Sequence, residues 1–236
     1  MSDLFIPGEP GIRTAKTATP RHIFYQAQGA MFRAGLARID GDLARDPGQA
    51  AADIGVLRPG ILMGKITTGG QYAPSAYGLT TNAEAAGSTA IEASAAVVTE
   101  LVRRKGATGT FKLIGPAAAS GTVNVETVTY SAASGTTITV TAIVNAFVAS
   151  SIIAPVDGSE LPLTFIANEQ NGGLQVVDTD GTTSLDAVEF GQFPMGGPVD
   201  AAQLLPWPAD DSIRRWIIGE LRRQTGGSFT FPTFDF

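Results

Sequence analysis

The sequence contains no cysteine and a single histidine, His22. Without thiols the chain cannot form disulfides, cysteine zinc sites or iron–sulfur clusters, and it has no thiol nucleophile. One imidazole cannot build a histidine-rich metal site, and no Gly-x-Ser-x-Gly motif presents a serine nucleophile. The sequence therefore predicts no catalytic residues, no metal ligands, no cofactor and no enzyme activity.

Charge is also scarce. Charged residues make up 16% of the chain, against roughly 25% in ordinary soluble domains. The net charge is −6, which disfavours binding to a nucleic-acid backbone. The most apolar stretch, residues 138–156, is interrupted by threonine, serine and asparagine and lacks the roughly 20 apolar residues of a membrane span. We therefore expect neither a nucleic-acid nor a membrane partner, and the N-terminus lacks the pattern of a secretory signal peptide.

Glycine and proline are abundant, with 28 and 14 residues, which is typical of many turns and short strands. A chain of 236 residues is long enough to bury a large hydrophobic core. The predicted fold class is mainly β with a few short helices, an α+β protein.

The first 20 residues are predicted to form an extended N-terminal arm, because they are rich in proline, glycine, threonine and alanine. The apolar residues Leu4, Phe5 and Ile6 are the exception, and they are candidates for adding to the edge of a neighbouring sheet. Residues 21–39 are predicted to contain two strands, with an apolar helical stripe as the alternative.

Residues 56–74 carry the clearest local pattern. A turn at Arg58-Pro59-Gly60 precedes a strand over residues 61–67, and Gly69-Gly70 predicts a tight hairpin turn before Gln71-Tyr72-Ala73-Pro74. The stretch Gly60 to Thr67 superficially resembles a phosphate-binding P-loop. It is one residue short between its glycines, and Ile66 separates Lys65 from the hydroxyl, so a hairpin is the better interpretation.

The composition then shifts to alanine, threonine, valine and serine over residues 82–155. A short helix is predicted from the N-cap Ser94 to Gly106, with basic residues in its last turn. Strands are predicted over residues 110–114, 122–130 and 136–144. This block is predicted to be a small β-rich subdomain inserted between two halves of a core, residues 21–81 and 156–236.

The C-terminal part is predicted to contain strands over residues 161–167 and 174–177. It is also predicted to contain one helix that is capped by Asp210 or Asp211 and ends at Gly226-Gly227. The acidic pairs Asp178/Asp180 and Asp210/Asp211 match turns and helix caps better than catalytic carboxylates or a calcium loop. Trp216 shares a helix face with Ile213 and Ile217, which indicates a core residue. The tail alternates four phenylalanines, and these are candidates for self-association: Phe229, Phe231, Phe234 and Phe236.

Residues 57–74, Leu-Arg-Pro-Gly-Ile-Leu-Met-Gly-Lys-Ile-Thr-Thr-Gly-Gly-Gln-Tyr-Ala-Pro, resemble the signature strand pair of the lambda-type head decoration proteins of tailed bacteriophages. In short members of that family an Asp-Gly-(Ser/Thr)-x-x-Pro stretch follows soon afterwards. Here the matching stretch, residues 157–166, follows after roughly eighty residues. Longer relatives carry a similar insert with a Glu-Leu-(Val/Ala)-Arg-Arg helix and a Gly-Thr-Phe-Lys-Leu-x-Gly-Pro strand end, as at Glu100 to Arg104 and Gly109 to Pro116.

The resemblance implies a non-enzymatic cement protein that is made in the host cytoplasm and binds the outer surface of the expanded phage head. Its partners would be the major capsid protein, with Leu4, Phe5 and Ile6 as the candidate contacts, and other copies of itself, most often in a homotrimer. Its effect would be to bridge neighbouring capsid subunits. A deletion joining Thr81 to Val156 is expected to fold and bind capsids, because tolerated insertions usually sit in exposed loops.

Two alternatives from other classes stay open. The Thr/Val/Gly-rich insert also suits a virion fibre or a receptor- or glycan-binding module, which would carry an exposed aromatic groove. A glycosidase would need two carboxylates in one cleft.

Overall fold

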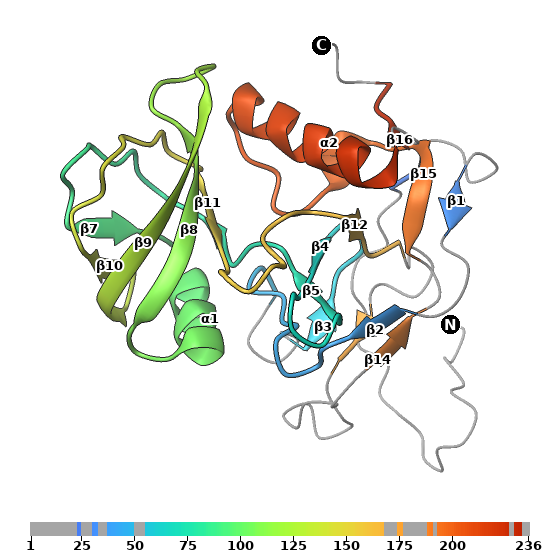
Figure 1. The fold of residues 1–236 in the computed structure, drawn as a ribbon, viewed down its shortest axis with the longest axis horizontal. Coiled ribbons are helices and arrows are strands. Elements are labelled where there is room, and N and C mark those ends of the chain that lie inside the picture. Colours follow the sequence, from blue (N-terminus) through green and yellow to red (C-terminus); the bar gives the residue numbers. More distant parts are fainter. Residues whose placement is uncertain are drawn as a thin grey trace.

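The computed structural model describes residues 23–24, 30–32, 37–49, 55–167, 174–176, 188–190, 193–226 and 229–232. These residues form many short strands, together with helices α1 (Ala95–Lys105) and α2 (Asp211–Thr225) and the 3-10 turn η2 (Ala201–Gln203). Strands clearly predominate (Figure 1), so the predicted mainly β, α+β fold class is confirmed.

A six-stranded antiparallel sheet is built from residues 78–154. Its strands are, in spatial order, β6 (Gly78–Leu79), β11 (Ile152–Ala154), β8 (Gly109–Pro116), β9 (Val123–Ser134), β10 (Thr137–Val140) and β7 (Ala90–Glu92). The first and last of these along the chain, β6 and β11, pair with each other, and the Tyr77 N–H donates to the Ile153 carbonyl at 2.8 Å. The chain therefore enters and leaves this sheet at neighbouring points.

Side chains of this sheet alternate between two hydrophobic cores. Leu113 of β8 and Ile153 of β11 pack on the side of α1. Their neighbours Ile114 and Ile152 pack on the other side, in a core that also contains the apolar face of α2. This follows from the two-residue period of a strand, which sends successive side chains to opposite faces. The sheet is thus buried on both faces along β8 and β11.

A second sheet contains the predicted hairpin. Its order is β12 (Thr164–Phe165), β4 (Leu62–Lys65), β5 (Tyr72–Pro74), β2 (Ala37–Ile39) and β14 (Val188–Phe190). Strands β4 and β5 are antiparallel, with Lys65 opposite Tyr72. Gly69 and Gly70 between them have φ angles of 90° and 70°, a left-handed conformation that glycine adopts without strain. The hairpin is confirmed.

Two small sheets complete the β structure. One has the order β1 (Met31–Phe32), β15 (Pro194–Pro198), β16 (Phe229–Thr230), and the other pairs β13 (Leu174–Gln175) with β3 (Val56–Leu57). Ile23 and Phe24 extend the first sheet, because Phe24 bridges Val199 and the Asp200 N–H donates to the Ile23 carbonyl at 2.8 Å. Residues 21–39 are predicted to contain two strands, and in this range the structure has the strands β1 and β2.

Both helices begin and end as predicted. The Ser94 side chain accepts from the Val97 N–H at the start of α1, and the helix ends at Gly106. Asp210, one of the two predicted caps, accepts from the backbone N–H groups of Ser212 and Ile213 at the start of α2. Gly226 ends α2 with a φ of 71°, in the left-handed region.

Some strands differ in length from the prediction. The strand predicted over residues 136–144 ends at Val140, and the N–H groups of Val144 and Asn145 donate to the Glu126 carboxylate instead of a strand. The strand predicted over residues 161–167 is limited to β12, since Pro162 has no N–H group that could donate to a neighbouring strand. Residues 177–187, which include Asp178 and Asp180, lie outside the described residues.

Candidate functional site

Residues 157–160 pack directly onto the β4–β5 hairpin, although roughly eighty residues separate the two segments in sequence. The Thr67 N–H donates to the Asp157 carbonyl at 2.8 Å. Gly64 of β4 lies so close to the Ser159 backbone that a Cβ at this position would be 1.9 Å from the Ser159 carbonyl oxygen. Strand β12 continues this contact, pairing Thr164 with Met63. The two sequence motifs are thus packed against each other, and we refer to the hairpin together with residues 157–160 as the hairpin surface.

Arg104 of α1 joins the six-stranded sheet unit to this hairpin surface. Its Nη2 lies 2.8 Å from Asp157 Oδ2 and also donates to Ser159 Oγ at 2.8 Å, while Nη1 donates to the Pro74 carbonyl at 3.0 Å. The Arg104 side chain is 1% exposed. We refer to Arg104, Asp157, Ser159 and the Pro74 carbonyl as the Arg104 junction. One guanidinium therefore links the helix, the hairpin and the 157–160 loop.

Asp157 stays ionised within the junction. Burial raises the pKa of this carboxyl, but the charge of Arg104 and the hydrogen bonds from Ser159 and Arg104 outweigh that effect and hold the pKa below its ordinary value of 3.8. The Ser159 hydroxyl donates to Asp157 Oδ1 at 2.6 Å. Asp157 is therefore an anion at neutral pH, and its charge is compensated by Arg104.

Tyr77 packs against the other side of Arg104. The Arg104 guanidinium carbon is 5.4 Å from the centre of the Tyr77 ring, within the range of a cation–π contact. The Tyr77 hydroxyl and Arg104 Nε are buried without a hydrogen-bond partner in the part of the chain that the structure describes. Burial raises the pKa of Tyr77, and the positive charge of Arg104 opposes this only in part. The phenol is therefore neutral at physiological pH.

One further ion pair and two hydrogen bonds connect the six-stranded sheet unit to other segments. Lys112 Nζ of β8 lies 2.6 Å from Glu160 Oε1, and the other Glu160 oxygen accepts from the Gly158 N–H at 2.8 Å. Arg103 of α1 pairs with Glu100 and also donates to the backbone carbonyls of Asp42 and Leu43. Helix α1 is thus tied to both the 157–160 loop and the 40–44 turn.

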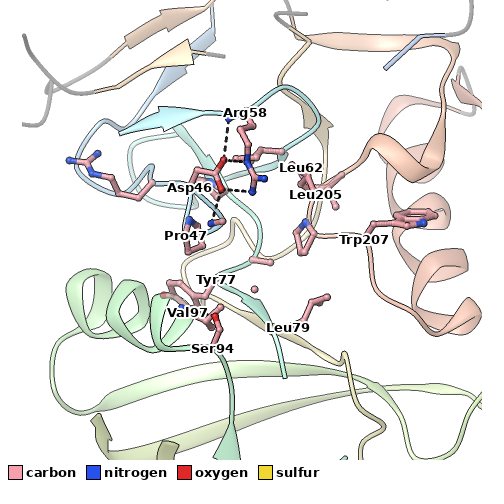
Figure 2. A pocket seen from close by; sticks show the side chains of 17 residues that line it. Asp46, Pro47, Arg58, Leu62, Tyr77, Leu79, Ser94, Val97, Leu205 and Trp207 are labelled. Carbon is pink, nitrogen blue, oxygen red and sulfur yellow. Dashed lines mark hydrogen bonds and ion pairs between the residues drawn. The ribbon is translucent and has the colours of Figure 1, made fainter. Parts of the chain in front are cut away.

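A pocket of about 300 Å³ (Figure 2) is lined in part by Pro74 and Tyr77, which also contact Arg104. Its walls come from residues 45–48, 58–62, 74–79 and 205–207 and from the start of α1. Asp46 and Arg58 lie at its edge, joined at 2.6 Å and 3.0 Å through both carboxylate oxygens. These two charges neutralise each other, and most of the other lining residues are apolar, so the pocket suits an apolar group. The remaining charge in its wall is Arg45, which donates to the carbonyls of Gly41 and Ala44. The pocket volume is at the lower limit of small-molecule sites.

The candidate residues from the sequence have different outcomes. Leu4, Phe5, Ile6, His22, Phe234 and Phe236 lie outside the described residues. Phe229 and Phe231 are 1% and 4% exposed, in the core that contains α2. These two side chains are therefore not exposed in the single chain, because they pack in the same core as α2, and self-association stays a prediction. Trp207 and Trp216 are partly buried against the same core.

Sequence reasoning missed both the Arg104 junction and the pocket. Arg104 was attributed to the favourable effect of basic residues at a helix C-terminus, and the signal for a more specific role was its place in the Glu-Leu-Val-Arg-Arg string. The pocket is formed by five segments distant in sequence, so no local pattern could reveal it.

Within the described ranges, no group of three or more histidine, aspartate or glutamate side chains could hold a metal ion. None of the helices there is long and apolar enough to cross a membrane. Comparison of the chain with protein-family models, curated proteins and solved structures found no match.

Proposed function

We propose that this chain is a bacteriophage head decoration protein, a cement that binds the outside of the mature capsid and bridges neighbouring capsid subunits. The proposal gives it no catalytic role and no cofactor. Its partners would be the major capsid protein and further copies of the chain, and its location would be the outer capsid surface after synthesis in the host cytoplasm.

One observation carries the proposal. The two segments that resemble the decoration-protein signature, residues 57–74 and 157–166, are far apart in sequence but pack against each other through β12–β4 pairing and the Gly64–Ser159 approach. The intervening residues form a sheet whose first and last strands are neighbours. This arrangement supports the interpretation of one signature interrupted by an insert.

The interior of the molecule is consistent with a mechanical role. The Arg104 junction and the Lys112–Glu160 pair hold the insert on the hairpin surface without any disulfide. A buried, hydrogen-bonded ion pair is costly to break once formed, because a separated charge would remain buried. A cement protein made in a reducing compartment needs such non-covalent links to transmit load between its parts.

The test uses expanded heads of the phage or prophage that encodes this chain, purified from a strain in which its gene is deleted. We expect the purified chain to co-sediment with expanded heads at saturable occupancy and to raise the temperature at which they rupture. Unexpanded proheads serve as the control shell and should bind much less. Absence of binding to expanded heads by the folded chain would overturn the proposal.

A fibre or glycan-binding role would give a different result in the same preparation. Such a module would be recovered with tail structures or would bind host cells, and expanded heads would neither bind it nor be stabilised by it.

A further inference from the structure

Helix α2 has a positively charged outer face. Its sequence contains four arginines and two acidic residues, whereas the whole chain has a net charge of −6. Figure 1 shows the helix at the edge of the molecule. The inner face is fully buried in the core at Ile213, Ile217, Ile218 and Leu221. The outer face is exposed at Arg215, Gly219 and Arg223.

Two of the four arginines fold back onto their own chain. The Arg214 guanidinium carbon is 5.6 Å from the centre of the Trp207 ring. The corresponding carbon of Arg222 is 5.5 Å from the centre of the Phe231 ring. These contacts place Arg214 and Arg222 against the body of the molecule, so their charges serve its own packing.

The other two arginines are available to another molecule. The ion pairs that the structure describes within α2 join Arg214 to Asp211 and Arg223 to Glu220, and neither includes Arg215. The Arg223 side chain is 58% exposed, and an ion pair at such a position contributes little to stability. Carboxylates of a partner can therefore pair with both exposed guanidinium groups at little cost to the fold.

Gly219 lies between these two arginines, four residues from each. Residues four apart share one helix face, and we call Arg215, Gly219 and Arg223 the α2 row. A Cβ on Gly219 would meet nothing within 4 Å, so packing within the described chain does not require glycine here. Glycine in a helix interior costs about 0.5–1 kcal/mol relative to alanine. What it provides is helix backbone that another molecule can approach closely.

We propose that the α2 row is a docking surface for an acidic segment of a partner protein, whose carboxylates pair with Arg215 and Arg223 while its chain lies over Gly219. The two arginines are eight residues apart, which corresponds to about 12 Å along the helix axis. An extended segment with acidic residues four positions apart, or a helix with acidic residues two turns apart, has the same spacing. The identification of this partner as the major capsid protein rests on the function proposed above.

Charge disfavours the other occupants of this surface. Antiparallel packing of two copies about a twofold axis at Gly219 would place Arg215 of each copy beside Arg223 of the other, and parallel packing would place each arginine beside its counterpart. Like charges in contact are costly in either case. A long polyanion such as DNA would also meet the rest of a chain whose net charge is −6. A short acidic segment meets the row alone.

The first test needs no capsid and uses a column of immobilised poly-L-glutamate. We expect the parent chain to be retained at low salt in spite of its net charge. Arg215→Gln and Arg223→Gln should each elute at a lower NaCl concentration, because each removes one ion pair with the column. The matched control is Arg38→Gln, which makes the same change at an exposed arginine of β2 and should elute with the parent.

Two results on columns would overturn the proposal. One is failure to retain the parent, or elution of Arg215→Gln and Arg223→Gln together with Arg38→Gln, because net charge rather than the α2 row would then govern retention. The other is stronger retention of the parent on immobilised duplex DNA, lost in the same two variants, because a nucleic acid would then be the occupant.

The second test measures binding to the expanded heads described above. Arg215→Gln, Arg223→Gln and Gly219→Leu should each weaken binding by about 5–30-fold, while Arg38→Gln binds as the parent does. Leucine is a better helix former than glycine, so Gly219→Leu blocks the approach without unfolding the helix, and urea denaturation checks this.

The two tests separate the docking surface from the proposed function. Heads that bind the parent and all of these variants equally would overturn the docking surface and leave the decoration role in place. Heads that do not bind the parent would overturn the decoration role. If the poly-L-glutamate column still distinguished the variants, the α2 row would stand as a docking surface for a different acidic protein.

Discussion

Arg104 is the residue on which the contact between the two parts of the molecule most depends. Its side chain is 1% exposed and bonds to Asp157, Ser159 and the Pro74 carbonyl. Replacing it with alanine would leave the largely buried Asp157 carboxylate with only the more distant Lys105 Nζ, at 3.7 Å, and would remove the donors to Ser159 and the Pro74 carbonyl. We expect Arg104→Ala to lower the free energy of unfolding by about 3–5 kcal/mol, measured by urea denaturation.

The matched control is Arg223→Ala, which removes an arginine of α2 whose side chain is 58% exposed and pairs with Glu220. An exposed ion pair contributes about 0–1 kcal/mol, so this variant should unfold nearly as the parent does. Arg104→Lys should fall between the two, because it keeps the charge but loses the planar fork. Equal stability of the two alanine variants would contradict the structural role given to Arg104.

Asp157 gives the protein a defined acid sensitivity. Its pKa in the folded state is lowered below 3.8, so the unfolded state binds the proton more readily. The stabilisation is complete above the unfolded pKa and is lost as the pH falls through the folded pKa. We expect the stability difference between the parent and Asp157→Asn, measured by urea denaturation, to be largest near pH 6 and to shrink below about pH 4.

The same pH series in an Arg104→Ala background provides the check. Without the guanidinium, the pKa of Asp157 loses the main interaction that lowers it, so adding Asp157→Asn should change the acid dependence much less. A stability difference between the parent and Asp157→Asn that is constant from pH 6 to pH 3 would refute this account.

At the scale of elements, the approach of β4 to the 157–160 loop depends on a glycine. A Cβ on Gly64 would be 1.9 Å from the Ser159 carbonyl oxygen and 2.7 Å from that of Leu161, both backbone atoms. The two segments would have to separate, so we expect Gly64→Ala to destabilise the fold by about 1–3 kcal/mol in urea denaturation.

The control is the same change at Gly219 in α2. A Cβ there would meet nothing within 4 Å, and alanine is the better helix former. Gly219→Ala should therefore stabilise the protein by about 0.5–1 kcal/mol. A Gly64→Ala variant as stable as the parent would contradict the close contact between β4 and the 157–160 loop.

Elements with local signals were predictable, and those that depend on distant partners were not. Ser94 and Gly106 bound α1, Asp210 and Gly226 bound α2, and Gly69-Gly70 turns the hairpin, each through neighbours in sequence. The burial of Phe229, a predicted self-association residue, was not predictable because it depends on β15 and α2, which no local pattern specifies. For the same reason Arg104 could be assigned to a helix end but not to its partner Asp157, 53 residues away.

At the scale of the whole molecule, residues 82–155, the predicted insert, share one hydrophobic cluster with the predicted core. Ile114, Ile152 and Ala154 of the six-stranded sheet pack in the same cluster as Ile213 and Ile217 of α2. A deletion of residues 82–155 would remove these side chains along with Arg104 and expose α2. We therefore expect this deletion to destabilise the protein far more than the removal of an exposed loop would, contrary to the expectation that the shortened chain folds.

Cooperative unfolding of the two parts can be tested with the natural tryptophans, because Trp207 and Trp216 both pack against the α2 core. Phe111 is fully buried on the opposite, α1 side of the six-stranded sheet. Phe111→Ala should lower the stability of the insert by about 3–5 kcal/mol. If the shared cluster couples the parts, the tryptophan fluorescence transition in urea should move by the same amount, whereas Val125→Ala, at a half-exposed position on β9, should leave it in place. A tryptophan transition unmoved by Phe111→Ala, while hydrogen exchange in β8 and β9 accelerates, would mean that the insert unfolds on its own.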